Sequence, residues 1–141
     1  MKPAERRRAR QFAVQAIYQW QMTQANVANI IDQFLIDQDL AKTDLDYFRD
    51  LVTGVIQHCD ELDHTLAPYL ARKLNDMDQV DKAILRLAMF ELTKRSDIPY
   101  KVVINEAIEL AKDFATDESH KYVNGVLDKY AVSQKMRQSD K

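Results

Sequence analysis

The side chains best suited to bind a ligand lie near the C-terminus, in the segment DESHKYVNGVLDK at positions 117–129. At 100° per residue, five of them share one flank of a helix, roughly 160–260° from the first apolar position. These five are Glu118, Lys121, Tyr122, Gly125 and Lys129. An aromatic ring among cations suits a single-stranded nucleic acid, because bases stack on rings and phosphates pair with charges. The alternative is a half-buried tyrosine at the rim of the core, surrounded by solvated charges.

A second group of cations lies at the N-terminus, where residues 1–10 hold five basic side chains and one acidic one. In a helix that starts here, with Arg6 taken as 0°, the apolar arc is centred near roughly 300° and a polar flank lies between about 0° and 120°. That flank holds Arg6, Arg7, Arg10 and Tyr18. The pattern predicts an ordered basic face that meets RNA at one end and a protein at the other. The alternative is a disordered arginine run.

The residues that usually carry catalysis or bind metal are few and poorly spaced. His58, His64 and His120 lack the i, i+4 spacing of a helical metal pair, and the lone Cys59 cannot form a thiolate cluster. With only two glycines, the chain has no glycine-rich loop for phosphates. The sequence therefore predicts no enzyme, no metal site and no cofactor.

Composition indicates one all-α domain. The 141 residues are 46% hydrophobic and 30% charged, with only 2 Gly and 3 Pro to make turns. No apolar run approaches the ~18–20 residues of a membrane span, and a single cysteine suits a reducing compartment, so we expect a cytoplasmic protein without membrane association. Since the net charge is −2, the basic N-terminus indicates a local polyanion site rather than a generally basic surface.

Apolar spacing predicts four helices in the first half of the chain. They are residues 3–22, a helix capped by Asn26 or Asn29, residues 45–56, and residues 62–70. Pro68 falls inside the fourth, where it either kinks the helix or marks a first turn.

Three further helices are predicted in the second half, over residues 78–94, 99–114 and 117–130. Asp78 and Asp81 form a capping arrangement at the start of the first of these. That helix is apolar around most of its circumference, which predicts a central buried position. Side chains at positions 116–119 are candidate caps for the last helix.

We therefore expect about seven helices arranged as two small packed bundles. Residues 1–75 and 76–132 would form the bundles of a single domain (1–132), and residues 133–141 a polar tail that frays.

Five stretches together resemble the NusB family of bacterial transcription antitermination factors. They are RRRARQFAVQAIYQWQ, FRDLVTGV, QVDKAILRLAMFEL, SDIPYKVVINEAIELAKDF and SHKYVNGVLDK, which span residues 6–129. The resemblance implies an all-α fold of two three-helix bundles, although we count one helix more in the first half. It also implies an RNA-binding adaptor without enzymatic activity.

The same resemblance implies specific partners. Members of the family pair with NusE, which is also a small-subunit ribosomal protein, and the heterodimer recognises the boxA element of nascent single-stranded RNA. Together with other Nus factors it makes RNA polymerase resistant to termination, notably during transcription of ribosomal RNA.

Site residues follow from the resemblance position by position. The RNA-binding positions would be Lys2, Arg6, Arg7, Arg10, Glu118, Lys121 and Tyr122. Relatives carry aspartate at the Glu118 position, and the adjacent Asp117 is an alternative contact to the base edge. The positions facing NusE would be Tyr18 and Asp81.

Two other functions compete with this hypothesis. Some ribosomal RNA cytosine methyltransferases carry a domain of this fold, but this chain has no glycine motif for a cofactor. Some relatives self-associate, so a helical dimerisation module without sequence-specific RNA binding, present as a homodimer, is the second hypothesis.

Overall fold

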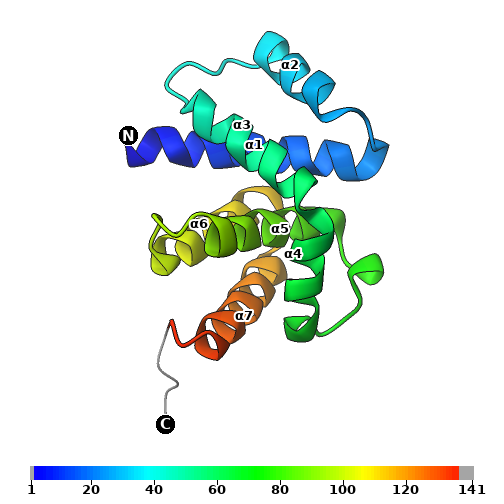
Figure 1. Cartoon of the computed structure of the whole chain (residues 1–141), viewed down its shortest axis with the longest axis vertical. Helices are drawn as coiled ribbons and strands as arrows, with labels where there is room; N and C mark the ends of the chain where they lie inside the picture. Colours follow the sequence, from blue (N-terminus) through cyan, green and yellow to red (C-terminus); the bar gives the residue numbers. More distant parts are fainter. Residues whose placement is uncertain (1, 137–141) are drawn as a thin grey trace.

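The computed structural model describes residues 2–136 as an all-α protein (Figure 1). It contains seven α-helices and two short 3-10 helices: α1 (Pro3–Thr23), α2 (Val27–Asp37), α3 (Leu45–Gln57), α4 (Cys59–Leu66), η1 (Ala67–Tyr69), η2 (Leu74–Asp76), α5 (Gln79–Lys94), α6 (Tyr100–Phe114) and α7 (Asp117–Ser133). The predicted helical class and number of helices are confirmed. Most of the expected tail, residues 137–141, lies outside the described residues.

Side-chain caps mark the starts of three of the seven α-helices, α2, α3 and α5. Asn26 caps α2 and Asp78 caps α5, each with a side-chain oxygen that accepts two backbone N–H groups. Helix α4 ends at Leu66, and the chain continues as η1, because Pro68 has no backbone N–H for an α-helical hydrogen bond. Thr116 is the N-cap of α7 but makes no capping bond. Its hydroxyl lies 3.1 Å from that of Ser119, so the expected side-chain cap is absent there.

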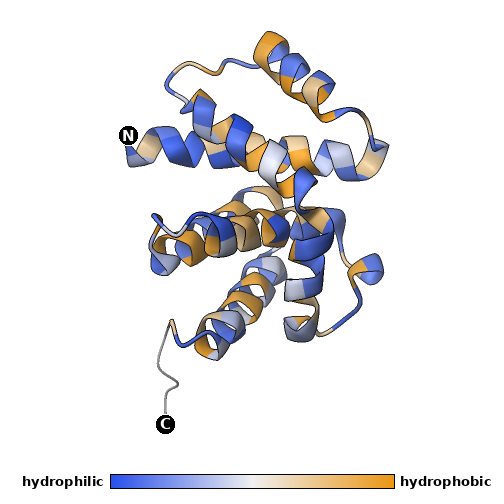
Figure 2. Cartoon of the chain, in the orientation of Figure 1, coloured by the Kyte–Doolittle hydropathy of each residue, from blue (hydrophilic) through white to orange (hydrophobic). Residues whose placement is uncertain are grey.

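Helix α5 occupies the centre of the fold, as expected from its apolar circumference. It packs against α1 and α3 on one side and against α4, α6 and α7 on the other (Figure 1). Figure 2 shows apolar residues gathered along the sides of α5 and α7 that meet other helices. Ile84, Leu85, Ala88 and Met89 are fully buried. The two groups of helices therefore share one continuous core.

Helix α4 packs with the second group, although residues 1–75 were expected to form the first bundle. It lies beside α5, and η1 contacts α7 (Figure 1). The loop between η1 and η2 is thereby placed next to the start of α7. Within the described part of the chain, no helix is both long and apolar enough to span a membrane.

Candidate nucleic-acid interface

A groove of about 800 Å³ opens where α7 begins, between that helix, the start of α5 and the loop after η1. It is lined by the predicted RNA-binding residues Glu118, Lys121 and Tyr122. Asp81 from α5 and Arg72 from the loop line it as well. We call this the Tyr122 groove. The fold thus brings three predicted RNA contacts and one predicted protein contact into a single depression.

The Tyr122 ring is held in place by the loop between η1 and η2. The backbone N–H of Ala71 donates a hydrogen bond to the Tyr122 hydroxyl, at 3.3 Å. The guanidinium of Arg72 lies 5.3 Å from the ring centroid, a cation–π contact. Tyr122 is only partly buried, so part of this positioned side chain remains exposed beside a cation.

Glu118 and Lys121 form the charged edge of the same groove. Their side chains are 86% and 69% exposed, and Lys121 Nζ lies 3.9 Å from Glu118 Oε1. An exposed pair at this distance contributes little to stability. Both charges are therefore available to a ligand.

Asp81 differs from these residues because its carboxylate is buried. The residue is 9% exposed, and its Oδ1 has no hydrogen-bond partner within the described chain. Burial raises the pKa of Asp81, and a hydrogen bond with Ser119 offsets part of the shift. A buried acceptor that lines a groove without a donor is suited to a donor from a bound molecule.

A second groove, of about 390 Å³, lies between the starts of α1 and α6. Arg6 and Arg7 line it, facing Pro99 and Glu106 of the α6 side. The Arg7 side chain is 59% exposed, and its Nε and Nη2 donate to the two carboxylate oxygens of Glu106 at 3.1 and 2.9 Å. This arrangement fixes the orientation of the Arg7 guanidinium while leaving one edge open to solvent.

The cations next to Arg7 differ in how far contacts within the protein already engage them. Lys2 is exposed at the N-cap of α1. The Arg6 guanidinium lies 4.5 Å from the centroid of the Tyr47 ring and 3.8 Å from Asp44 Oδ2. Its side chain remains 29% exposed, so Arg6 is partly engaged by the protein itself.

Arg10, in contrast, lies in the interior. Its side chain is 4% exposed, and Nε and Nη2 donate to the Glu91 carboxylate at 3.1 and 2.8 Å. Tyr47 donates its hydroxyl proton to the same carboxylate, and Nη1 of Arg10 reaches Glu106 at 3.4 Å. Burial disfavours the charged guanidinium, but the bonds and charge of Glu91 raise the pKa of Arg10 overall. The structure therefore places Arg10 in a buried ion network at the inner wall of the groove that Arg6 and Arg7 line.

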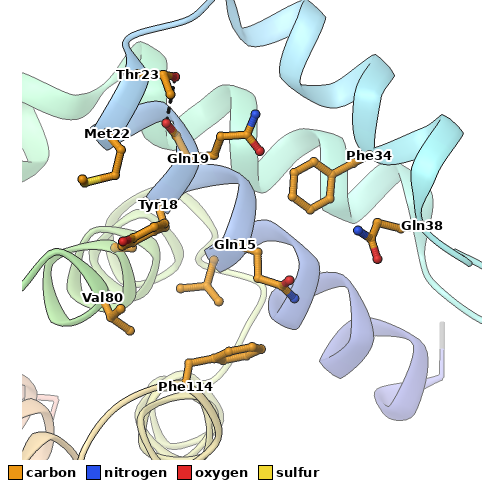
Figure 3. Close-up of a pocket in the computed structure, with 11 residues that line it drawn as sticks. Gln15, Tyr18, Gln19, Met22, Thr23, Phe34, Gln38, Val80 and Phe114 are labelled. Atoms are coloured by element: carbon orange, nitrogen blue, oxygen red, sulfur yellow. Dashed lines mark hydrogen bonds between the residues drawn. The ribbon is translucent and has the colours of Figure 1, made fainter.

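Tyr18 lines a third groove, of about 510 Å³, which is mostly apolar (Figure 3). Tyr18 and Met22 are 39% and 57% exposed along α1. Val80 and Phe114 form the opposite wall, and both also line the Tyr122 groove. The Tyr18 groove and the Tyr122 groove therefore adjoin at these two side chains.

Arg72 lines the Tyr122 groove, but the sequence did not indicate that it belongs to this site. It is 50 positions from Tyr122 and lies in a loop, where helical periodicity carries no information about neighbours. The only signal was a pair of adjacent cations, Arg72 and Lys73, after a predicted helix. The packing of η1 on α7 brings Arg72 onto the tyrosine ring.

The fold and the grooves define an all-α protein of two packed helical groups, with binding surfaces that lie open along helices. Residues 7–132 match the family model described as the NusB family. The chain belongs to this family.

Similarity to individual relatives extends over nearly the whole chain. The chain is 69% identical over 140 residues to transcription antitermination protein NusB of Psychromonas ingrahamii, covering 99% of this chain and 97% of that protein. It is 67% identical over 129 residues to the protein of the same name from Aeromonas salmonicida, covering 92% and 94%.

Solved structures share the fold. T. maritima NusB matches with a TM-score of 0.80 and 34% identity, over 93% of this chain and 92% of that one. A crystal structure of antitermination factors NusB and NusE in complex with dsRNA matches with a TM-score of 0.78. At 24% identity, over 94% of this chain and 99% of that one, this second match supports the fold alone.

Proposed function

We propose that this protein is a transcription antitermination factor that binds boxA-containing single-stranded RNA together with NusE. Through other Nus factors it would join an antitermination complex on RNA polymerase, notably during transcription of ribosomal RNA in the cytoplasm. Its relatives carry the name transcription antitermination protein, and a protein of the same fold has been solved with NusE and RNA. The observation that carries the proposal is the Tyr122 groove, where a fixed, partly open ring lies among exposed charges.

In this proposal an unstacked base lies on the Tyr122 ring, and a phosphate pairs with Lys121. Glu118 accepts a hydrogen bond from a base edge. Asp117 is also exposed, one residue earlier in the first turn of α7, and is the alternative acceptor. Sequence preference would thus come from the start of α7, because bases rather than phosphates distinguish one RNA from another.

Lys2, Arg6 and Arg7 supply phosphate contacts at the other end of α1. Arg7 is the best oriented of the three because Glu106 holds its guanidinium. Arg10 contributes indirectly, since it binds the same Glu106 from inside the protein. Its role in this proposal is to position Arg7.

The NusE contact uses the apolar Tyr18 groove together with Asp81, a buried acceptor in the adjoining Tyr122 groove. Tyr18 would pack against the partner, and a donor from NusE would satisfy the free oxygen of Asp81. Because Val80 and Phe114 are shared with the Tyr122 groove, RNA and NusE would bind side by side. We expect the coupling to be positive, so that NusE and RNA each increase the affinity for the other by the same factor.

The proposal is tested by fluorescence anisotropy with a labelled boxA RNA and a scrambled RNA of equal length, at two salt concentrations, with and without NusE. We expect tighter binding of boxA, a further gain with NusE, and weakening as salt increases. Equal binding of both RNAs without an effect of NusE would contradict it. A tight dimer in sedimentation that excludes RNA would then favour the dimerisation module.

A further inference from the structure

Gly125 occupies the middle of α7, where the fold of this chain does not require glycine. Neither glycine has a positive φ, so the backbone at Gly125 suits any L-residue. A Cβ built at Gly125 meets no atom within 4 Å, whereas one at Gly54 would lie 2.2 Å from a carbon of the Phe90 ring. A helix with glycine in its interior is less stable than the same helix with alanine there. Packing therefore explains Gly54 but leaves Gly125 unexplained.

Gly125 lies between two lysines on one line of the helix. Lys121, Gly125 and Lys129 recur at i, i+4 and i+8, and all three are exposed. The line is about 12 Å long at 1.5 Å per residue. We call it the α7 strip.

The α7 strip continues the Tyr122 groove toward the C-terminal end of the helix. Lys121 belongs to both surfaces. The opposite side of α7 is covered, since Val123, Val126 and Leu127 are buried in the core. Near its end, η1 packs against the helix, where the Tyr69 hydroxyl lies 2.7 Å from that of Ser133.

We propose that the α7 strip carries the sugar–phosphate backbone of the same single-stranded RNA whose base stacks on Tyr122. The inference rests on the proposed function and extends the RNA-binding surface by about two turns of helix beyond Tyr122. Lys121 and Lys129 each pair with a phosphate. Gly125 lets the RNA backbone approach the helix surface between them, since a methyl group would stand in its path.

The chemistry of the strip favours a polyanion over a protein partner. Its two side chains are cationic and it presents no apolar group, whereas the Tyr18 groove offers the apolar surface that a protein needs. Lys121 has Glu118 nearby, but only at 3.9 Å and in solvent. A phosphate can displace such a weak pair.

Gly125→Ala distinguishes a role in RNA binding from a role in folding, because it should stabilise the helix while weakening the binding of RNA. We expect a melting temperature about 3 °C higher, as for a favourable helix substitution in a domain of this size, and RNA affinity reduced roughly threefold to tenfold. Asn124→Ala is the matched control, since Asn124 is exposed but lies about 100° around the helix from Gly125. It should leave RNA binding unchanged.

Lys129→Ala tests the charge. It should lower the slope of log affinity against log salt by about 0.7, as expected for one phosphate contact with a single strand. Arg49→Ala removes an equal charge from an exposed position on α3 and should leave the slope unchanged. Both measurements use the full chain and the boxA RNA without NusE.

Other results would overturn the inference. A Gly125→Ala protein that is more stable and binds RNA normally would show that the RNA backbone does not approach the helix closely at Gly125. A normal RNA affinity combined with weaker NusE binding would assign the strip to a protein instead. Tyr122→Ala separates these outcomes from failure of the proposed function: if it weakens RNA binding while Gly125→Ala and Lys129→Ala do not, only the strip is wrong.

Discussion

Tyr122 is fixed before any ligand arrives, since a backbone N–H holds its hydroxyl and Arg72 lies against its ring. A preorganised ring loses little conformational freedom when a base stacks on it. We expect Tyr122→Ala to weaken boxA binding by about 1–3 kcal/mol, the usual value of one base–aromatic stack. Tyr122→Phe keeps the ring and should retain most of the affinity in the same anisotropy assay. If both variants bind as the unmodified protein does, no base stacks there.

Asp81 combines a cost to folding with a candidate role in partner binding. Because burial raises its pKa, the folded protein binds this proton more readily than the unfolded chain does. The contribution of Asp81 to stability is therefore most favourable below the ordinary carboxyl pKa of 3.8 and falls as pH rises through the raised pKa of the folded state.

We expect Asp81→Asn to raise the melting temperature at pH 7 and to weaken pairing with NusE. The gain in melting temperature should disappear below about pH 3.8, where the carboxyl is neutral in both states. Thermal melts across this pH range, with titrations of NusE at pH 7, provide the measurement. A lower melting temperature at pH 7 would show that the ionised form stabilises the fold.

Helices α3 and α5 approach closely at Gly54, where an added Cβ would lie 2.2 and 2.3 Å from two atoms of the Phe90 ring. Phe90 is 4% exposed and its ring stacks near His58, so it has little room to move. We expect Gly54→Ala to destabilise the protein by about 1–3 kcal/mol through overpacking. Urea unfolding measures this cost. In a Phe90→Leu background the cost should be smaller, and an equal cost in both backgrounds would place the strain elsewhere.

The positions of the helices could be predicted from local signals. Apolar spacing and the Asp78 cap located α5. The fourth helix was expected over residues 62–70, but α4 spans Cys59–Leu66 and Pro68 lies in η1. The association of α4 with α5 was not predictable in this way. A short amphipathic helix has one apolar face, and nothing in its own residues specifies which neighbour will cover that face.

The site was predictable where its residues share one helix. Helical phase placed Lys121 and Tyr122 together, and the structure has them in one groove. Phase also put Arg10 on the flank of α1, but Glu91, 81 positions away, accepts its guanidinium in the interior. Arg72 reaches Tyr122 from a loop. Contacts between distant segments decide both cases, and the periodicity of a single sequence carries no record of such contacts.

Across the whole molecule, a buried network ties the two helical groups to the surface that we propose for RNA. Arg10 of α1 and Tyr47 of α3 meet Glu91 of α5, while Arg10 also reaches Glu106 of α6. Glu106 in turn holds the exposed Arg7. Four helices therefore determine where one surface guanidinium points.

Substitutions in this network distinguish two possible roles of Arg10, which are to position Arg7 or to contact RNA directly. Removing one member of a buried ion network leaves a buried charge without its partner, so Arg10→Ala should cost about 3–5 kcal/mol of stability. If Arg10 only positions Arg7, the folded fraction should bind RNA with a nearly unchanged salt slope, because no phosphate contact is lost. Arg7→Ala is the matched variant and should lower that slope while costing little stability, since its pair with Glu106 is half exposed. A stable Arg10→Ala protein with a reduced slope would show instead that Arg10 leaves the interior to meet RNA.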